Sequence, residues 1–285
     1  MEAIRETLSE ALSVKSAITV LVAAIVLSSV FSAYLTPYDP TAIDLDSVKS
    51  GPSVKHPFGT DSKGRDILSR VLYGGRLSLG VSLLASITSL VIGLSMGLTA
   101  GYFSSRPGKL AWVDTAIMAL VDLTLSFPSL LLSIGISVLL PPGALTVIVA
   151  ISLVGWASFT RLIRGEVLKI REALYVYAAR SIGATHYRIV VYHILPQCLS
   201  IGKAMIGIKF GSYILTEASL SFLGLGPQPP SPSWGNMISE NRAYILTDPW
   251  MVIFPGLAIA VTILAFNIVG DIYRQNYGIE GGMKG

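Results

Sequence analysis

The chain has 285 residues, of which 52% are hydrophobic and only 13% are charged. A soluble domain averages about 25% charged residues, so this composition, with a mean hydropathy of +0.65, excludes an ordinary soluble protein and predicts an all-α integral membrane protein. The net charge of +4 does not indicate nucleic-acid binding, because the basic residues flank apolar runs as they do in membrane proteins. A single cysteine, Cys198, excludes an intramolecular disulfide and a cysteine-rich metal site, and three histidines argue against a histidine metal cluster.

Six apolar segments predict about six transmembrane helices, at residues 17–35, 77–101, 112–140, 144–159, 199–223 and 250–269. The first follows an N-terminal stretch, residues 1–16, and exceeds the roughly 7–15 apolar residues of a signal-peptide core, so we expect a retained helix. A polar loop, residues 36–76, separates it from a five-helix core, residues 77–273. Residues 274–285 form the C-terminus. The sequence Pro141-Pro142-Gly143 predicts a tight turn within the core.

An even number of spans places both termini on one side of the membrane. The loop between the fourth and fifth segments, residues 161–198, carries six basic residues: Arg161, Arg164, Lys169, Arg171, Arg180 and Arg188. The second-to-third loop and the termini add Arg106, Lys109, Arg5, Lys15, Arg274 and Lys284. These positions predict that this side is cytoplasmic. The loop of residues 36–76 argues against that orientation, because it also holds Lys49, Lys55, Lys63, Arg65, Arg70 and Arg76.

The basic loop is predicted to form a helix, a turn and a second helix near the membrane surface. Residues 165–182 are compatible with helix, and Ala178-Ala179 offers a flat patch that another backbone could approach. Gly183 is placed to end the first helix in the left-handed conformation. A second helix, residues 185–194, should then end at Leu195-Pro196, because proline disfavours helix in the residue before it. The pattern favours a protein docking site, with a lipid-anchored interfacial helix as the alternative.

This segment resembles the EAA loop of ABC importer permeases, which reads Glu-Ala-Ala, three residues, Gly, nine residues and Ile-x-Leu-Pro. Here the sequence is Tyr177-Ala178-Ala179, then Gly183, then His193-Ile194-Leu195-Pro196. Tyrosine in place of glutamate and histidine in place of isoleucine are similar to the dipeptide/oligopeptide/nickel branch. The motifs Phe58-Gly59-Thr60-Asp61, Gly64-Arg65-Asp66 and 218–226 also resemble that branch, in its second, C-type permease.

The resemblance implies a type I ABC importer permease fold with a cytoplasmic EAA coupling loop, in a multi-pass protein of the prokaryotic plasma (inner) membrane. It implies one half of a translocation path for di- or oligopeptides. The expected partners are a sister permease in a heterodimer, two ATPase subunits, an extracytoplasmic substrate-binding protein and the lipid bilayer. The residues expected to couple to the ATPase are Tyr177, Ala178, Ala179, Arg180, Gly183, Ala184, Leu195 and Pro196.

No catalytic residue, cofactor or metal ligand is expected on this chain, and ATP and Mg are expected on the ATPase subunits. The one near-match to a phosphate-binding loop, residues 59–66, has Arg65-Asp66 where such a loop needs Lys-Ser or Lys-Thr. Nickel and oligosaccharides stay open as cargo. An ion-coupled secondary transporter is a further alternative, although no internal repeat supports it.

Three ionisable residues within the predicted spans, Asp122, Lys209 and Glu217, are candidates for the translocation path, because a charge in lipid is costly. The alternative is structural hydrogen bonding to the sister permease. Lys209 and Glu217 lie about 12 Å apart along a helix and about 80° around it. Ala119 stands where the family usually has arginine, so Asp122 is expected to lack a nearby partner. Gly202, Gly207 and Gly211 should permit close helix packing.

Overall fold

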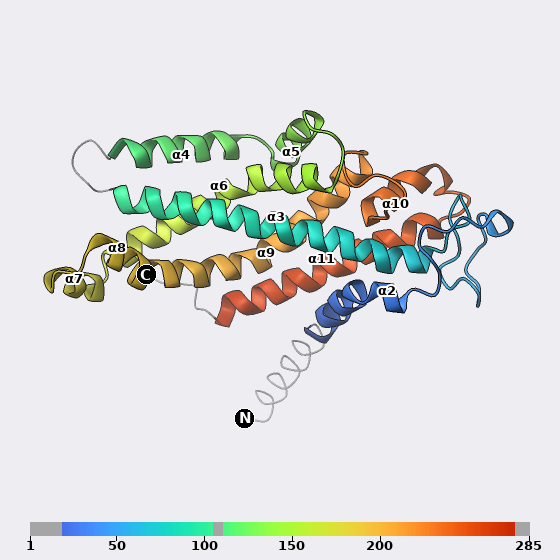
Figure 1. The fold of residues 1–285 in the computed structure, drawn as a ribbon, viewed down its shortest axis with the longest axis horizontal. Coiled ribbons are helices and arrows are strands. Elements are labelled where there is room, and N and C mark those ends of the chain that lie inside the picture. Colours follow the sequence, from blue (N-terminus) through green and yellow to red (C-terminus); the bar gives the residue numbers. More distant parts are fainter. Residues whose placement is uncertain (1–18, 105–110, 277–285) are drawn as a thin grey trace, which may run out of the picture. The chain divides into compact units, whose positions relative to one another are not determined.

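The computed structural model describes residues 19–104 and 111–276, and helices are the regular elements of both ranges. The all-α prediction is confirmed for these residues. The helices (Figure 1) are Thr19–Val30, α2 (Ser32–Leu35), α3 (Ile67–Phe103), α4 (Ala111–Ser126), α5 (Ser129–Val138), α6 (Ala144–Arg171), α7 (Leu174–Ser181), α8 (His186–Ile189), α9 (Leu195–Phe222), α10 (Trp234–Asn241) and α11 (Trp250–Asn276). Short 3-10 turns at Leu45–Ser47 and Arg242–Tyr244 and a π-helical turn at Val190–Ile194 complete the described elements.

Several predicted features lie outside the described residues. They are the N-terminal stretch 1–16, the first two residues of the first segment, and the basic residues Arg5, Lys15, Arg106, Lys109 and Lys284. The predicted C-terminus, residues 274–285, is described only as far as residue 276.

Four of the described helices are long and apolar enough to cross a membrane: Ile67–Phe103, Ala144–Arg171, the continuous stretch His186–Phe222, and Trp250–Gly270. The bent pair formed by α4 and α5 would make a fifth. The first predicted segment is present as the shorter apolar helix Thr19–Val30, described from Thr19 onward. The count of six spans therefore stays a prediction.

The third predicted segment, residues 112–140, is not one straight helix. It divides into α4 and α5, which are bent by 95° at Phe127-Pro128. The cause is Pro128, because proline disfavours helical conformation in the preceding residue but is well suited to start a helix. Its carbonyl accepts the Leu132 amide at 3.0 Å and so opens α5. The hydropathy of residues 112–140 did not indicate this break, because the segment is apolar on both sides of it.

Two predicted boundaries were wrong because charged residues were assigned to loops. Helix α3 begins at Ile67, so the first loop ends at residue 66 rather than 76, and α6 continues to Arg171 rather than ending at 159. Arg70 of α3 and Arg161 and Arg164 of α6 all find carboxylate partners. A paired charge is far less costly in a helix that crosses apolar surroundings than an isolated one.

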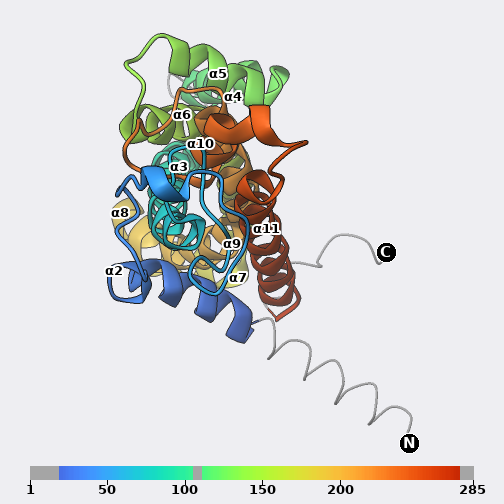
Figure 2. The same ribbon diagram turned by 90° about the vertical axis from the view of Figure 1, so that its right-hand side faces the viewer.

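The described residues form two compact units, each with its own core. One unit comprises residues up to 84, 136–148 and from 207 onward. Its core joins α3, α9, α10 and α11 through Leu79, Phe210, Ile214, Ala218, Trp234 and Ile259, and a second cluster contains Ile67, Val71, Met237 and Met251. Figure 2 looks onto the loop of residues 36–66 and α10, which belong to this unit.

In the same unit, α9 and α11 approach closely through three glycines, two on α9 and one on α11. A Cβ atom added at Gly270 would lie 3.1 Å from the Gly207 backbone carbon, and one added at Gly211 would lie 2.6 Å from the Asn267 side-chain oxygen. These contacts confirm the close packing predicted for Gly207 and Gly211. Small residues permit such approaches, which bring helix backbones within van der Waals range.

The second unit comprises residues 85–135 and 149–206. Here Gly93, Gly97 and Gly101, one per turn of α3, face α6, and added Cβ atoms would collide with Phe159, Ile163 and Val167 respectively. Gly202 packs against Leu90 in the same way. The core of this unit is a cluster of buried residues: Ile163, Val167, Ile170, Val176, Ile189, Ile194 and Cys198. It anchors α7 and α8 to α6.

Candidate functional site

The basic loop forms two short helices, α7 and α8, as the sequence predicted, but their boundaries differ. The predicted helix 165–182 is broken, since α6 ends at Arg171 and α7 begins at Leu174. Ala173 between them is extended, with a ψ of 143°. The residues favour helix throughout, so the break reflects tertiary packing: the turn allows Val176 to join the buried cluster with Ile170 and Val167.

Gly183 ends α7 as predicted. Its φ is +82°, a conformation that glycine adopts without steric cost. The Ala184 amide donates to the Ala179 carbonyl and the Gly183 amide to the Arg180 carbonyl, both at 3.0 Å. This pair of bonds is the Schellman motif, which satisfies the last carbonyls of a helix and reverses the chain.

Thr185 begins α8, and its hydroxyl accepts the Arg188 amide at 3.4 Å. The prediction that Leu195-Pro196 stops this helix was wrong. The chain stays helical from His186 to Phe222 through the π-helical turn Val190–Ile194. A proline ring clashes with the carbonyl four residues earlier, here that of Tyr192, and the wider π turn accommodates the mismatch.

The predicted coupling residues do not share one degree of exposure. Tyr177, Ala178, Arg180, Gly183 and Pro196 are exposed, Ala184 and Leu195 are partly buried, and Ala179 is 7% exposed. Ala179 therefore supports the turn more than it presents a surface. Residues 177–184 lie together at the α7–α8 turn, whereas Leu195 and Pro196 belong to the start of α9.

A depression of about 450 Å³ lies between the two short helices. It is lined by Tyr175, Ala178, Ala179, Ile182, Gly183, Ala184, Arg188 and His193. Tyr175, Ile182 and Arg188 were not among the predicted coupling residues, although their i, i+4 spacing from the motif residues could have indicated them. The Tyr175 hydroxyl accepts a hydrogen bond of 2.8 Å from Gln197 Nε2 and so ties α7 to α9.

Ile182 lines this depression, and other large apolar side chains of the same loop are also exposed. Leu174, Ile182, Tyr187 and Tyr192 are between 68% and 87% exposed. A cluster of exposed apolar residues rimmed by polar groups is typical of a surface that contacts another molecule. We call α7, the Gly183 turn and α8 the α7–α8 surface.

Asp122 does have a partner, contrary to expectation. Arg161 of α6 donates to its carboxylate, in a pair whose side chains are 52% and 65% exposed. Arg161 of α6 thus supplies the positive charge that the family usually has at position 119. Eight residues earlier in α4, Asp114 accepts two hydrogen bonds from Arg164, of 2.6 and 2.7 Å.

Glu217 and Lys209, the other two charged candidates, lie in different surroundings. Glu217 is fully buried, and its Oε1 accepts the Ser221 hydroxyl at 2.7 Å. Its Oε2 has no hydrogen-bond partner among the residues that the structure describes. Lys209 is half-buried on the same helix.

The stretch that partly resembles a phosphate loop serves a different purpose. Arg65 is 3% exposed in its side chain and donates to Asp61 at 2.7 Å and to Glu240 at 2.5 Å. Asp66 contacts His56 at 2.9 Å. In residues 59–66 these charges are engaged in holding the loop together. Nearby, the Ser47 hydroxyl, followed by the Asp46 amide, lowers the pKa of Asp44 from its ordinary value.

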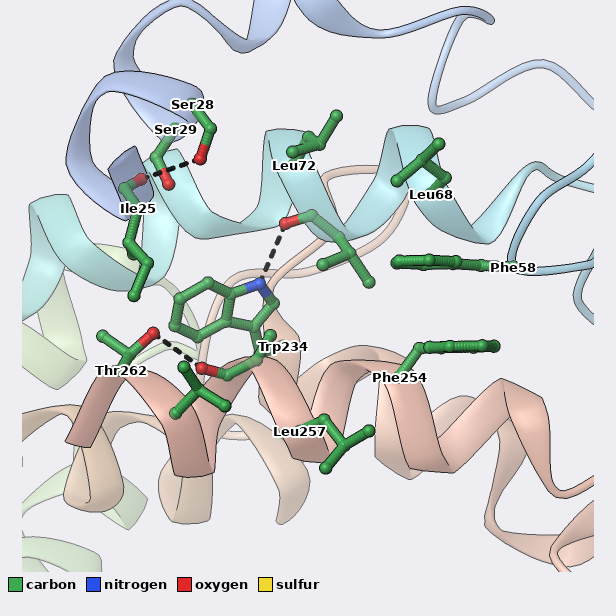
Figure 3. Close-up of a pocket in the computed structure, with 13 residues that line it drawn as sticks. Ile25, Ser28, Ser29, Phe58, Leu68, Leu72, Trp234, Phe254, Leu257 and Thr262 are labelled. Carbon is green, nitrogen blue, oxygen red and sulfur yellow. Dashed lines mark hydrogen bonds between the residues drawn. The ribbon is translucent and has the colours of Figure 1, made fainter. Parts of the chain in front are cut away.

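An apolar groove of about 410 Å³ lies in the same unit (Figure 3). Its lining includes Trp234, whose indole nitrogen donates to the Val71 carbonyl at 2.9 Å. Figure 3 also shows Phe58 stacked on Phe254, with ring centroids 4.0 Å apart. The groove runs between α3 and α11, and its chemistry is that of hydrocarbon packing.

The comparisons with known proteins agree with this architecture. The family described as "Binding-protein-dependent transport system inner membrane component" matches residues 89–277. The glutathione transport system permease protein GsiD of Pectobacterium atrosepticum is 41% identical over 243 residues, which are 85% of this chain and 79% of that protein. The dipeptide transport system permease protein DppC of Alkalihalophilus pseudofirmus is 39% identical over 256 residues, 90% of this chain and 82% of that protein.

Solved structures show the same fold. The MetNI methionine ABC transporter in an inward-facing conformation matches with a TM-score of 0.59 and 20% identity, covering 73% of this chain and 97% of that chain. An amino acid ABC transporter crystallised with histidines matches with a TM-score of 0.55 and 16% identity, covering 73% of this chain and 94% of that chain. The type I importer permease fold expected from the sequence is confirmed.

Proposed function

The chain belongs to the family of binding-protein-dependent transport system inner membrane components, and from this premise we propose that it forms half of an ATP-driven translocation path for small peptides. The names of its relatives support the cargo, since one is a dipeptide permease and another a permease for glutathione, a tripeptide. Nickel or an oligosaccharide is the alternative cargo of the same machinery.

In this proposal the α7–α8 surface binds a separate ATPase subunit. The observation that carries it is the depression between α7 and α8, which is lined by small residues and by the exposed side chains of Tyr175 and Ile182. Ala178 and Gly183 lie in the depression, and Tyr177 and Arg180 lie beside it on exposed turns of α7. The Schellman turn holds this shape with backbone hydrogen bonds. A displacement of the α7–α8 surface by the ATPase subunit would be transmitted to α6 and α9 through the buried cluster that contains Ile163, Val176 and Cys198.

The assembly would contain this chain, a sister permease, two ATPase subunits that bind ATP and Mg, and an extracytoplasmic substrate-binding protein. The chain itself would carry no catalytic residue. Both termini and the α7–α8 surface would be cytoplasmic, and residues 36–66 would face the binding protein. Asp122 and Lys209 would contribute to the path, whereas the complete burial of Glu217 supports a packing role for it.

Reconstitution tests the proposal. Proteoliposomes that hold all four kinds of component should take up a labelled dipeptide only when ATP and the loaded binding protein are present. Uptake that persists without the ATPase subunits and collapses with a proton ionophore would instead identify an ion-coupled secondary transporter. Uptake of nickel or an oligosaccharide in place of the dipeptide would support the ATP-driven importer but contradict the peptide cargo.

A further inference from the structure

Helix α4 exposes two different stripes along its length. The apolar stripe is Trp112, Ala116, Leu120 and Leu123, and all four residues are exposed. The second stripe, which we call the polar stripe, is polar at Thr115, Asp122 and Ser126 and small at Ala119, and all four residues are exposed. At about 100° per residue, the centres of the two stripes lie roughly a quarter of a turn apart. A helix in a membrane protein that is apolar on one exposed face and polar on the next meets two different surroundings.

The polar stripe contains the exposed ion pair of Asp122 with Arg161. Lipid does not suit this pair, because charged side chains in spanning segments face the protein interior or water. The pair lies about 12 Å along α4 from Asp114 by helical rise, so it is far from the first turn of the helix and about one turn before the helix ends at Ser126. We therefore expect this stripe to face water.

The two ion pairs between α4 and α6 differ in the way they are built. Arg164 grips Asp114 with two parallel hydrogen bonds, and the two side chains are 25% and 12% exposed. Arg161 contacts Asp122 through one nitrogen and one oxygen, and both side chains are more than half exposed. The first pair fastens the helices together. An exposed, single-contact pair contributes little to stability, so it can open when a ligand offers better contacts.

We propose that Asp122 and Arg161 form a binding station for a compact zwitterion, such as a dipeptide or free amino acid, in a water-filled part of the path. The ligand ammonium would bind the Asp122 carboxylate. The ligand carboxylate would bind the Arg161 guanidinium, whose planar fork matches a carboxylate with two parallel hydrogen bonds. One weak pair is exchanged for two complementary ones, so the station is neutral both with and without its ligand. The proposal rests on the proposed function, since it names the charge pattern of the peptide cargo.

The first test measures access of water to the two stripes. Ala119→Cys and Ala116→Cys introduce matched thiols three residues apart on α4, and the native Cys198 is buried. In the full complex in nanodiscs, a charged methanethiosulfonate reagent should label Ala119→Cys at least tenfold faster than Ala116→Cys, measured by mass spectrometry of this chain. Labelling of Ala119→Cys as slow as that of Ala116→Cys in a lipid-covered position would mean that lipid or the sister permease covers the polar stripe, and it would overturn the proposal.

The second test asks for the zwitterion. Millimolar glycylglycine should slow labelling of Ala119→Cys at least threefold, whereas its N-acetylated, C-amidated form should not. Adding Arg161→Gln should abolish this protection while labelling stays fast. Equal protection by both compounds, or none by either, contradicts the zwitterion station.

The third test separates a path role from a structural one. Asp122→Asn and Arg161→Gln should lower the number of peptides transported per ATP at least tenfold in complexes that assemble normally. An unchanged ratio would overturn the station. If the unmodified complex carries no dipeptide at all, the proposed cargo is wrong, but labelling and protection at position 119 still decide the station independently.

Discussion

Arg65 Nη2 donates a hydrogen bond of 2.5 Å to Glu240 Oε2 and thereby joins the loop of residues 36–66 to α10. Arg70 donates to the same oxygen at 3.2 Å, and Asp61 lies between the two guanidinium groups, 2.7 Å from Arg65 and 3.6 Å from Arg70. The arginine side chains are 3% and 2% exposed. Two buried cations and two carboxylates balance one another, so these charges hold the loop to α10 in addition to the apolar cluster in which Phe58 packs near Met237.

We expect Glu240→Gln to destabilise the protein strongly. The substitution leaves two buried arginines with one carboxylate, and breaking a buried ion pair typically costs about 3–5 kcal/mol. Lys63→Gln is the matched control, because Lys63 reaches the same glutamate at 3.8 Å from an exposed position, where an ion pair contributes about 0–1 kcal/mol. Thermal unfolding of the purified protein in detergent measures both. Similar melting temperatures for the two variants would contradict this account.

We expect Gly270→Val to separate α9 from α11. An added Cβ would lie 3.1 Å from the Gly207 backbone, and backbone cannot move aside as a side chain can. Overpacking of this kind costs about 1–3 kcal/mol. Gly80→Val is the control, since nothing lies within 4 Å of an added Cβ there. The melting temperature should fall for the first variant and stay close to the unmodified value for the second; a reversed order would refute the close approach.

Gly183→Asp should abolish transport while the protein still inserts and assembles. Asparagine and aspartate both tolerate a positive φ, so Gly183→Asn provides an isosteric control that keeps the turn. The aspartate adds a negative charge at the C-terminus of α7, where the helix dipole disfavours it, and it places that charge in the proposed ATPase contact. The measurement is ATP-dependent uptake by complexes that carry either variant. Full uptake by the aspartate variant would contradict the proposed coupling role of the α7–α8 surface.

Glu217→Gln should assemble and transport nearly normally. Glu217 is fully buried and already receives a hydrogen bond from Ser221, so an amide of the same shape preserves the packing. Glu217→Ala, by contrast, should lower the melting temperature because it leaves a cavity and an unpaired hydroxyl. A glutamine variant that assembles but does not transport would instead indicate that Glu217 contributes to the translocation path.

Local chemistry predicted the parts of the fold that depend on a few neighbouring residues. Gly183 could be identified as the end of α7 because the left-handed conformation is a property of one residue. Gly207 could be identified as a close approach because only small residues allow one. The motif around Ala178 and Ala179 indicated the family to which the chain belongs. None of these inferences needed a distant contact.

Predictions that depended on remote partners were less successful. Asp122 lacked a visible partner in sequence, because Arg161 lies 39 positions away and only the packing of α4 on α6 brings it near. For the same reason α6 was expected to end before its arginines, and the helix after Leu195-Pro196 was expected to start anew rather than continue through a π turn. The 95° bend at Phe127-Pro128 was missed for a different reason, because its cause, Pro128, is local and lies within a segment that is apolar throughout.

By itself, the sequence determined that the chain is an all-α membrane protein, where most of its helices lie and which family motif it carries. These properties follow from hydropathy, proline and glycine, whose effects act within a few residues. Only the tertiary structure decided which charges neutralise one another: Arg65 with Glu240, Arg164 with Asp114 and Arg161 with Asp122. Electrostatic pairing depends on distance in space, and helix packing alone sets those distances.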